Sequence, residues 1–361
     1  MWPFMCFVLV VSPWLLVNIR AESLNSGDPC QTPTGTKGTC VPVRNCSYVQ
    51  KISRRTDFTH YDSIYLESLK CGVMKVPGRK RTIPLVCCPK FENSACREDF
   101  ANRIHFGEET ERGELPWAGL LFYDTGRNRT VPKCGGTLVN ERYVITAAHC
   151  TVDRPNWKLL YVRFNEFNTS SKENCTMIND EEVCRYDYAV ESIIPHPDYD
   201  MHKNSRPNDI CIVRLAEDVT FNNFVKPICL PFEPEVQELP IVNQNFTVTG
   251  WGETEVALRS DVQKHVVLPG LENEACNTVY KVANVTLTDK QLCIGGLKGS
   301  DSCRGDSGGP LVREAWGDWI LVGVVSFGAR LCGTENLPGV YTNVMKYLDW
   351  FEDVIFVEHY W

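Results

Sequence analysis

The chain has 361 residues, of which 43% are hydrophobic and 23% are charged, and its formal net charge at pH 7 is −8. This composition is ordinary for a folded globular protein and excludes a disordered chain, and the acidic balance argues against nucleic acid as a partner. The length allows one large domain and one small one. Eighteen cysteines indicate an oxidising compartment and a disulfide framework, whereas the paired C-x2-C sets typical of zinc sites are missing.

The N-terminus has the pattern of a secretory signal. Phe4–Val17 is an apolar run broken only by Ser12 and Pro13, and Ile19-Arg20-Ala21 follows as a cleavage site. We therefore assign residues 1–21 to a signal peptide. The apolar run is too short for a comfortable membrane span, although the absence of Lys or Arg before it leaves a signal anchor as an alternative.

A cysteine-rich module follows over residues 30–88. A module of this size builds only a small core, so disulfides are expected to supply most of its stability. Cysteine spacing alone does not choose among the possible pairings. The six cysteines are Cys30, Cys40, Cys46, Cys71, Cys87 and Cys88.

Beyond a polar linker, short apolar runs alternate with Gly, Pro and Asn, a pattern that predicts an all-β domain. The last segment, Met345–Val357, places its apolar residues at helical spacing and predicts a helix packed on that domain. The runs are Leu120–Tyr123, Thr137–Val139, Tyr143–Thr146, Leu159–Phe164, Ile210–Leu215, Phe246–Thr249, Ile320–Ser326 and Val340–Val344.

Three segments carry residues suited to nucleophilic catalysis. Ser307 lies among glycines in Asp-Ser-Cys-Arg-Gly-Asp-Ser-Gly-Gly-Pro, where small residues let a substrate backbone approach a hydroxyl. A serine needs an imidazole to accept its proton and a carboxylate to orient that imidazole. His149 ends a short apolar strand, and Asp209 opens an apolar run in which an unpaired carboxylate would be costly.

Gly-x-Ser-x-Gly also fits the nucleophile elbow of the α/β-hydrolases, in which the chain order is Ser, acid, His. Here His149 and Asp209 both precede Ser307, which excludes that fold. From Ile104 to the C-terminus the chain resembles the trypsin-like serine proteases of the chymotrypsin fold. The matching blocks are Thr-Ala-Ala-His-Cys, Asn-Asp-Ile, Gly-Asp-Ser-Gly-Gly-Pro, Trp251-Gly252 and Pro338-Gly-Val-Tyr341. The resemblance implies two antiparallel six-stranded β-barrels, with the site between them and a C-terminal helix.

Residues 30–88 resemble the clip domain of arthropod serine proteases in their cysteine spacing, although an unrelated knottin-like module is the alternative. The implied domains are a clip domain (30–88), a linker and activation segment (89–103) and a peptidase domain (104–361). The pairs implied by the resemblance are Cys30–Cys87, Cys40–Cys71, Cys46–Cys88, Cys96–Cys229, Cys134–Cys150, Cys175–Cys184, Cys276–Cys293 and Cys303–Cys332. Cys211 is then left as a buried free thiol.

The resemblance also implies a zymogen that is cut between Arg103 and Ile104. The new α-ammonium of Ile104 would then pair with Asp306, since each buried charge needs its partner. This pairing would aim the backbone N–H groups of Gly305 and Ser307 at the oxyanion of the reaction.

The implied primary pocket has Asp301 at its floor, which favours an Arg or Lys side chain of the substrate. Ser302 is a further hydrogen-bonding group for that cation. Gly328 and Gly339 form the pocket walls, and the edge that begins at Ser326 would pair with a substrate strand.

Two kinds of surface site are also expected. The acidic residues Glu166, Asp180, Glu181 and Glu182 offer oxygen ligands for a calcium ion, although such acids are more often simply solvated. Six glycosylation sequons fit a secreted glycoprotein, at Asn45, Asn128, Asn168, Asn174, Asn245 and Asn284.

Together these features predict a secreted serine endopeptidase of arthropod haemolymph that cleaves proteins after Arg or Lys, needs no cofactor and binds no membrane. The family implies a step in an immune cascade, either melanisation or the Toll pathway. Its partners would be downstream zymogens such as prophenoloxidase or other clip proteases, an upstream activating protease and serpin inhibitors. The alternatives are a non-catalytic clip-domain homologue that acts as a binding cofactor, and a digestive protease.

Overall fold

The computed structural model describes residues 24–33, 37–54, 58–75, 82–89, 96, 110, 112–126, 129–153, 156–178, 181–253, 259–299, 302–328 and 333–357. The chain divides into two compact units, one ending at Lys90 and the other beginning at Phe91. Several predicted features lie outside the described residues, namely the signal peptide (1–21), Arg103 and Ile104, Asn128, Asp180, Asp301 and Cys332.

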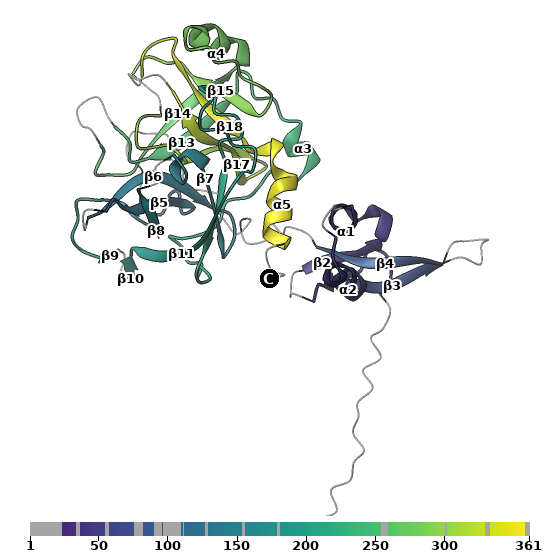
Figure 1. Cartoon of the computed structure of the whole chain (residues 1–361). Coiled ribbons are helices and arrows are strands. Elements are labelled where there is room, and N and C mark those ends of the chain that lie inside the picture. Colours follow the sequence, from purple (N-terminus) through teal and green to yellow (C-terminus); the bar gives the residue numbers. More distant parts are fainter. Residues whose placement is uncertain are drawn as a thin grey trace, which may run out of the picture. The chain divides into compact units, whose positions relative to one another are not determined.

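The small unit is built on a four-stranded antiparallel sheet in the order β1-β2-β4-β3 (Figure 1). Its two short helices, α1 and α2, follow the second strand in the chain and were not predicted. The second helix starts at a capping box, in which Thr59 accepts from the Asp62 backbone and the Asp62 carboxylate accepts from the Thr59 backbone. The elements are β1 (Pro29–Gln31), β2 (Lys37–Pro42), η1 (Val43–Asn45), α1 (Ser47–Ser53), α2 (His60–Ser68), β3 (Lys70–Lys75) and β4 (Thr82–Pro89).

The large unit contains two closed antiparallel barrels of six strands each (Figure 1). The strand order is β11-β12-β7-β6-β5-β8 in the first barrel and β13-β14-β15-β18-β17-β16 in the second. The first barrel consists of β5 (Ala118–Asp124), β6 (Thr130–Leu138), β7 (Tyr143–Thr146), β8 (Lys158–Phe164), β11 (Tyr186–Pro195) and β12 (Cys211–Leu215). The second consists of β13 (Asn245–Gly250), β14 (Lys264–Leu271), β15 (Gln291–Gly295), β16 (Pro310–Ala315), β17 (Asp318–Phe327) and β18 (Pro338–Asn343).

The large unit also contains short helices and one hairpin outside the barrels. The hairpin β9 (Cys175–Ile178) and β10 (Glu181–Cys184) stands apart from both barrels as a two-stranded sheet. The helical elements are η3 (Ala148–Cys150), α3 (Pro234–Gln237), α4 (Asn273–Tyr280), η4 (Lys281–Ala283), η5 (Val344–Lys346) and α5 (Leu348–Val357).

The predicted fold class is confirmed, and the eight predicted apolar runs all fall on barrel strands, with bounds that shift by a few residues. Four barrel strands were missed: β11, β14, β15 and β16. The C-terminal helix begins at Leu348 rather than Met345, because the 3-10 turn Val344–Lys346 precedes it.

The described residues contain seven disulfides, and each is a pair that the resemblance implies. They are Cys30–Cys87, Cys40–Cys71, Cys46–Cys88, Cys96–Cys229, Cys134–Cys150, Cys175–Cys184 and Cys276–Cys293. Cys303 is also disulfide-bonded. In the part of the chain that the structure describes, no helix has the length and apolar character needed to span a bilayer.

Candidate active site

The strand register of the first barrel brings His149 to Asp209. Strands β7 and β12 are antiparallel neighbours, and their register pairs Thr146 with Cys211. Asp209 lies two residues before Cys211, and the 3-10 turn Ala148–Cys150 starts two residues after Thr146. Two residues far apart in the sequence therefore meet at one end of this strand pair.

The Asp209 carboxylate is fully buried and accepts three hydrogen bonds. Its Oδ1 accepts from the His149 backbone N–H at 2.9 Å, and its Oδ2 lies 2.8 Å from His149 Nδ1 and 2.5 Å from the donating Ser326 hydroxyl. Burial alone raises the pKa of this carboxyl, but the facing His149 ring and the hydrogen bonds outweigh burial and hold the pKa below its usual range. Asp209 is thus an ionised group that fixes the orientation of the His149 ring.

The Ser307 loop lies between the two barrels. The Ser307 carbonyl accepts from the Gly135 N–H of β6 at 2.8 Å, and the Gly308 N–H donates to the Val325 carbonyl of β17 at 2.8 Å. Gly308 has φ +78, and a Cβ there would collide with Thr146 Oγ1 and the Gly135 carbonyl. Only glycine fits this close approach, so the loop is held against both barrels.

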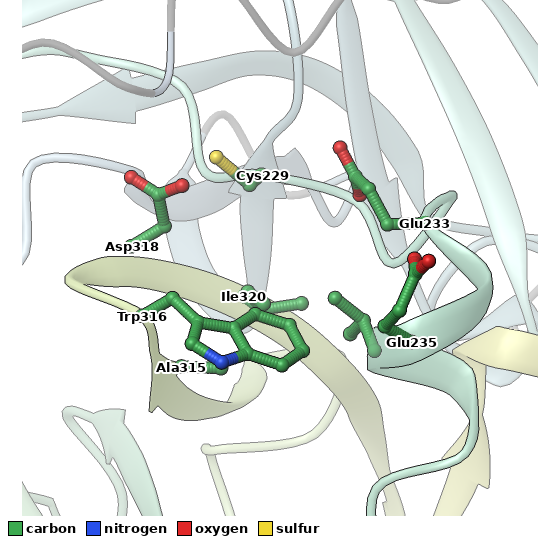
Figure 2. Close-up of a pocket in the computed structure, with 8 residues that line it drawn as sticks. Cys229, Glu233, Glu235, Ala315, Trp316, Asp318 and Ile320 are labelled. Carbon is green, nitrogen blue, oxygen red and sulfur yellow. The ribbon is translucent and has the colours of Figure 1, made fainter.

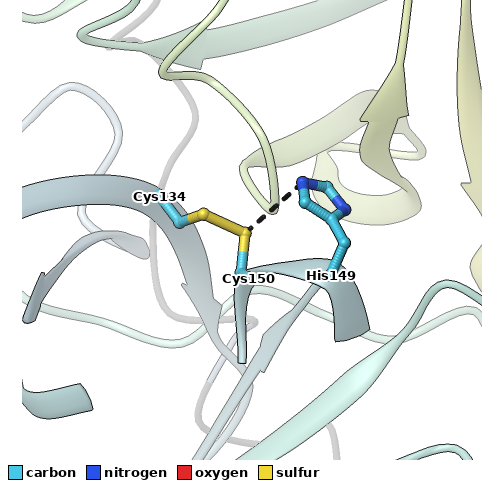
Figure 3. A group of neighbouring side chains, drawn as sticks. All are labelled: Cys134, His149 and Cys150. Atoms are coloured by element: carbon cyan, nitrogen blue, oxygen red, sulfur yellow. Dashed lines mark hydrogen bonds between the residues drawn. A yellow bond between two sulfur atoms is a disulfide. The ribbon is translucent and has the colours of Figure 1, made fainter. Parts of the chain in front are cut away.

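The His149 ring lies beside the Cys134–Cys150 disulfide (Figure 3). Its Nε2 is 3.8 Å from Cys150 Sγ, and the same sulfur is 3.6 Å from the Ser307 carbonyl. Both cysteines are used in the disulfide, so this cluster is no metal site. In the described part of the chain no hydrogen bond joins the Ser307 hydroxyl to His149, and such bonds often tighten only when substrate binds.

Asp306 is a second buried carboxylate next to Ser307. Its Oδ1 accepts from the Gly252 N–H at 2.7 Å, and its Oδ2 accepts from the Cys303 N–H at 2.8 Å. Burial raises the pKa of this carboxyl, and the two backbone donors with the nearby Arg259 offset this only in part. The carboxylate therefore sits where a further positive charge would stabilise its ionised form.

The predicted pocket residues that the structure describes lie close together in the second barrel. A Cβ on Gly328 would come 3.8 Å from Gly339 Cα, so these two glycines face each other. The Ser302 hydroxyl accepts from the Tyr341 hydroxyl at 2.8 Å. Ser326, at the end of β17, is joined to Asp209 as described above and so links the pocket edge to the His149 pair.

Sequence reasoning missed the residues that hold Asp209 from behind. The Thr342 hydroxyl donates to the Asp209 carbonyl at 2.7 Å. Asn208 has φ 57, and its side-chain oxygen accepts from Lys290 Nζ at 2.9 Å and from the Tyr347 hydroxyl at 3.2 Å. The position of Asn208 directly before the acid was the available signal, but its partners come from the second barrel and the C-terminal segment.

The Glu166 carboxylate is occupied by arginines rather than arranged as part of a calcium site. Its Oε2 lies 3.2 Å from Arg163 Nη1 and 3.1 Å from Arg185 Nη1. A third cation, Arg112, interacts electrostatically with the same carboxylate. Oε1 is buried without a hydrogen-bond partner. Calcium takes six to eight oxygen ligands, and the predicted ligand Glu182 is exposed. The described residues do not fit calcium, because guanidinium groups already supply the positive charge.

The leftover thiol of Cys211 is buried, as expected. Burial raises its pKa to about 12, and the nearby Thr151 hydroxyl offsets this only in part. A thiol with so high a pKa stays protonated at neutral pH and is a poor nucleophile.

The described sequon residues differ in exposure. Asn45, Asn174, Asn245 and Asn284 are exposed. Asn168 is half-buried, and its side-chain oxygen accepts from the Ser170 N–H and hydroxyl.

A cavity of about 240 Å³ lies on another part of the large unit (Figure 2). Glu233, Glu235 and Asp318 stand around it, and Trp316 from the β16–β17 turn lies across from Glu235. Its wall includes Cys229, the disulfide partner of Cys96. No residue of the Asp209 cluster lines this cavity, so it lies apart from the candidate catalytic residues.

Two six-stranded barrels with an oriented histidine at their junction define the chymotrypsin-like class of serine protease. The family model described as "Trypsin" matches residues 104–351, and the model described as "Regulatory CLIP domain of proteinases" matches residues 30–88. The chain therefore belongs to the clip-domain serine proteases of the trypsin family.

Similar proteins support this membership over nearly the whole chain. The chain is 73% identical over 357 residues to "CLIP domain-containing serine protease B15" of Anopheles gambiae, covering 98% of each chain. It is 34% identical over 368 residues to "Melanization protease 1" of Drosophila melanogaster, covering 90% of this chain and 92% of that one. The crystal structure of the Drosophila Grass clip serine protease of the Toll pathway matches with a TM-score of 0.62 and 30% identity, covering 92% of this chain and 98% of that one.

Proposed function

We propose that the chain is a secreted serine endopeptidase zymogen that hydrolyses proteins after Arg or Lys. Ser307 is the nucleophile, His149 the general base and Asp209 the orienting acid. The observation that carries this proposal is the buried Asp209 carboxylate, which bonds the backbone N–H and the ring Nδ1 of His149 and the Ser326 hydroxyl. An aspartate with a purely structural role would not be expected to orient an imidazole next to a serine that is flanked by glycines.

In the proposed reaction the Ser307 oxygen attacks the scissile carbonyl carbon, and its proton moves to His149 Nε2. The carbonyl oxygen becomes an oxyanion that accepts from the backbone N–H groups of Gly305 and Ser307. His149 then gives the proton to the leaving amine, which departs as the acyl-enzyme forms. A water molecule then attacks the acyl-enzyme with His149 as the base, which releases the carboxylic acid product and restores the Ser307 hydroxyl. Asp209 stays ionised throughout, in agreement with its lowered pKa.

Activation by cleavage between Arg103 and Ile104 is part of the proposal, and the state of Asp306 supports it. Its burial and raised pKa fit a carboxylate that needs one more positive charge. The α-ammonium of Ile104 would supply that charge and fix the loop that carries Gly305 and Ser307. The proposed domains are a signal peptide (1–21), a clip domain (30–88), a linker and activation segment (89–103) and a peptidase domain (104–361).

The proposed specificity for Arg or Lys rests on the assignment of Asp301 as the acid at the floor of the pocket, with Ser302 as a second polar contact. Gly328 and Gly339 have no side chains that would obstruct a long substrate side chain at the pocket walls. A carboxylate in a closed slot rejects apolar side chains, because they would leave it unpaired.

An extracellular immune cascade is the proposed setting. The names of relatives support it, since they include a melanization protease and a protease of the Toll pathway. The proposed partners are downstream zymogens such as prophenoloxidase, an activating protease and serpins. Trypsin-like serine proteases need no cofactor, and the arginines around Glu166 argue against calcium there. Glycans on the sequons would agree with secretion.

The experiment is to express the full chain, cut it with a trypsin-like protease, inactivate that protease, and measure turnover of an Arg-amide substrate. A serine-directed covalent inhibitor labels the same sample. We expect turnover and labelling in the cut chain and neither in the uncut chain.

Two variants serve as controls. Ser307→Ala should lose labelling and about 10⁴-fold or more in kcat, as expected for a catalytic triad. Arg103→Gln should remain latent after exposure to the activating protease. A cut wild-type chain with neither turnover nor labelling would instead support a non-catalytic homologue, and broad digestion of unfolded proteins without site preference would support a digestive enzyme.

A further inference from the structure

Arg206 projects from the loop before Asp209 to the edge of the proposed substrate site. Its Nη1 donates to the Ser326 carbonyl at 3.3 Å, and the Ser326 hydroxyl is the group that bonds the Asp209 carboxylate. A guanidinium group from the first barrel thus touches the end of β17 in the second barrel, next to the His149 pair.

The loop holds this arginine in a defined place. Arg206 has φ 43, a left-handed conformation that is unusual for a side chain of this size. The backbone on its N-terminal side is tied to the second barrel, where Asn204 donates to the Ala283 carbonyl at 3.0 Å and Gln291 donates to the Ser205 carbonyl at 2.7 Å. The Arg206 N–H closes a turn onto the Lys203 carbonyl at 3.0 Å. The loop geometry is therefore set before any substrate arrives.

Among the described residues the Arg206 guanidinium is paired directly with no acid, and Asp209, on the other side of Ser326, is bound by His149. The side chain is half-buried, and within the described part of the chain it forms no ion pair and makes one hydrogen bond. Two acids of the neighbourhood have other partners, because Asp200 pairs with Lys203 and Asp153 accepts from the Tyr199 hydroxyl through both oxygens. A guanidinium has five N–H donors, so this one can still bind an anion.

The direction of a bound substrate strand follows from the pocket. If the scissile Arg or Lys enters between Gly328 and Gly339, the side chain just before it points to the opposite face of the strand, because side chains alternate along an extended chain. The pocket walls belong to the second barrel, so the opposite face is toward the first barrel and its loop 196–208. That loop presents Arg206.

We propose that Arg206 is a specificity-determining residue, which selects protein substrates with Asp or Glu immediately before the scissile Arg or Lys. This inference rests on the proposed function. An acidic side chain at that position accepts from the guanidinium in a charge-assisted hydrogen bond. The guanidinium then leaves the Ser326 carbonyl, which is the acceptor that a pairing substrate backbone needs. A neutral or basic side chain does not draw the guanidinium away. The backbone N–H of such a substrate then has to compete with Arg206 for the Ser326 carbonyl.

The test uses the cut full chain and a set of Arg-amide peptides that differ only in the residue before Arg, which is Asp, Glu, Asn, Ala or Lys. For wild type we expect kcat/KM to be about tenfold higher for Asp and Glu than for Ala, the range of a hydrogen bond to a charged group, and lowest for Lys. Asn is the uncharged match for Asp and should behave like Ala. Active-site titration with the covalent inhibitor puts all rates on the same basis.

Two variants isolate the guanidinium. Arg206→Gln keeps a polar, hydrogen-bonding side chain but removes the charge, so the Asp to Ala ratio should fall to about one, while Arg206→Lys should keep part of it. Added salt should lower the wild-type ratio, because exposed charges are screened. This salt measurement needs no variant and so stands even if Arg206→Gln folds poorly.

The outcomes separate this inference from the proposed function. Turnover of all peptides with equal kcat/KM for Asp and Ala, or a ratio that persists in Arg206→Gln, overturns the role of Arg206 and leaves the protease assignment intact. Absence of turnover for every peptide overturns the proposed function and the inference with it.

Discussion

Asp209 and Asp306 are both buried carboxylates beside the Ser307 loop, yet their pKa values shift in opposite directions. Asp209 faces an imidazole and accepts from a hydroxyl and a backbone N–H, which together outweigh burial. Among the described residues, Asp306 accepts from two backbone N–H groups, and the charge of the nearby Arg259 adds a weaker effect. At the scale of the residue, the difference lies in the partner and not in the depth of burial.

Ser326→Ala tests how much the hydroxyl contributes to Asp209. We expect kcat/KM for the Arg-amide substrate to fall by about tenfold, the range for one hydrogen bond to a charged group. The lowered pKa of Asp209 stabilises the folded chain at pH values above the pKa that this carboxyl has in the unfolded chain, and this stabilisation is lost as the pH falls through the folded-state pKa. The variant has less of this stabilisation, so it should unfold in acid at a higher pH than wild type. Steady-state kinetics and acid titration followed by circular dichroism measure both effects.

Thr342→Val is the comparison for this change, because the Thr342 hydroxyl donates to the neutral Asp209 carbonyl and not to the carboxylate. It should change the acid midpoint less than Ser326→Ala does. Equal midpoints for wild type and Ser326→Ala would contradict the stabilisation of the ionised Asp209 by this hydroxyl.

At the scale of the element, the segment between β8 and β11 is organised around one acid. Glu166 is 1% exposed in its side chain, Arg185 is 9% exposed, and Arg163 is 17% exposed and also binds Asp187 at 2.6 Å. The Arg185 side chain further donates to the Ser171 carbonyl at 3.2 Å. The segment is therefore fixed by arginine side chains, at the acid that the sequence offered as a possible calcium ligand.

Glu166→Gln should lower the free energy of unfolding by about 3 kcal/mol, because removing one partner leaves buried arginine charge uncompensated. The matched control is Glu191→Gln. Glu191 binds Arg142 and Arg214 but is 40% exposed, so its loss should cost about 1 kcal/mol or less. Denaturant unfolding measures both.

The same preparation tests the ion. EDTA and added calcium should leave the melting temperature of the wild-type chain unchanged. A rise in melting temperature with calcium, lost in Glu166→Gln, would show that the arginines do not replace the ion.

At the scale of the whole molecule, the two compact units are joined by a linker whose Cys96 is bonded to Cys229 of the large unit. In the sequence, the proposed cleavage after Arg103 lies between Cys96 and the first barrel strand, which begins at Ala118. Cutting the chain there removes the peptide connection, but the Cys96–Cys229 bond remains.

The cut chain should therefore run as one species on a non-reducing gel and as two after reduction, namely a clip fragment and a peptidase fragment. The double variant Cys96→Ser with Cys229→Ser should separate without reductant. Release of the clip fragment from the cut wild type in the absence of reductant would contradict the tether.

Local patterns in the sequence predicted a large part of this molecule. The short apolar runs were sufficient to predict an all-β domain, because a buried strand appears in the sequence as a short apolar run or as an alternation of apolar and polar residues. The strands that were missed include β11, whose half-buried and exposed residues alternate, and β15, whose apolar run is limited to Leu292–Ile294. The clip helix α2 was missed for a related reason: it has no buried residue and hence no apolar stripe.

What the sequence determined by itself was the order of His149, Asp209 and Ser307, and the residue types that such chemistry requires. What only the tertiary structure decided was which groups surround them: the Ser326 hydroxyl on Asp209, the Arg206 guanidinium on Ser326, and the arginines on Glu166. These contacts join segments that are distant in the chain, and their energies depend on distance and burial, which residue identity alone does not specify.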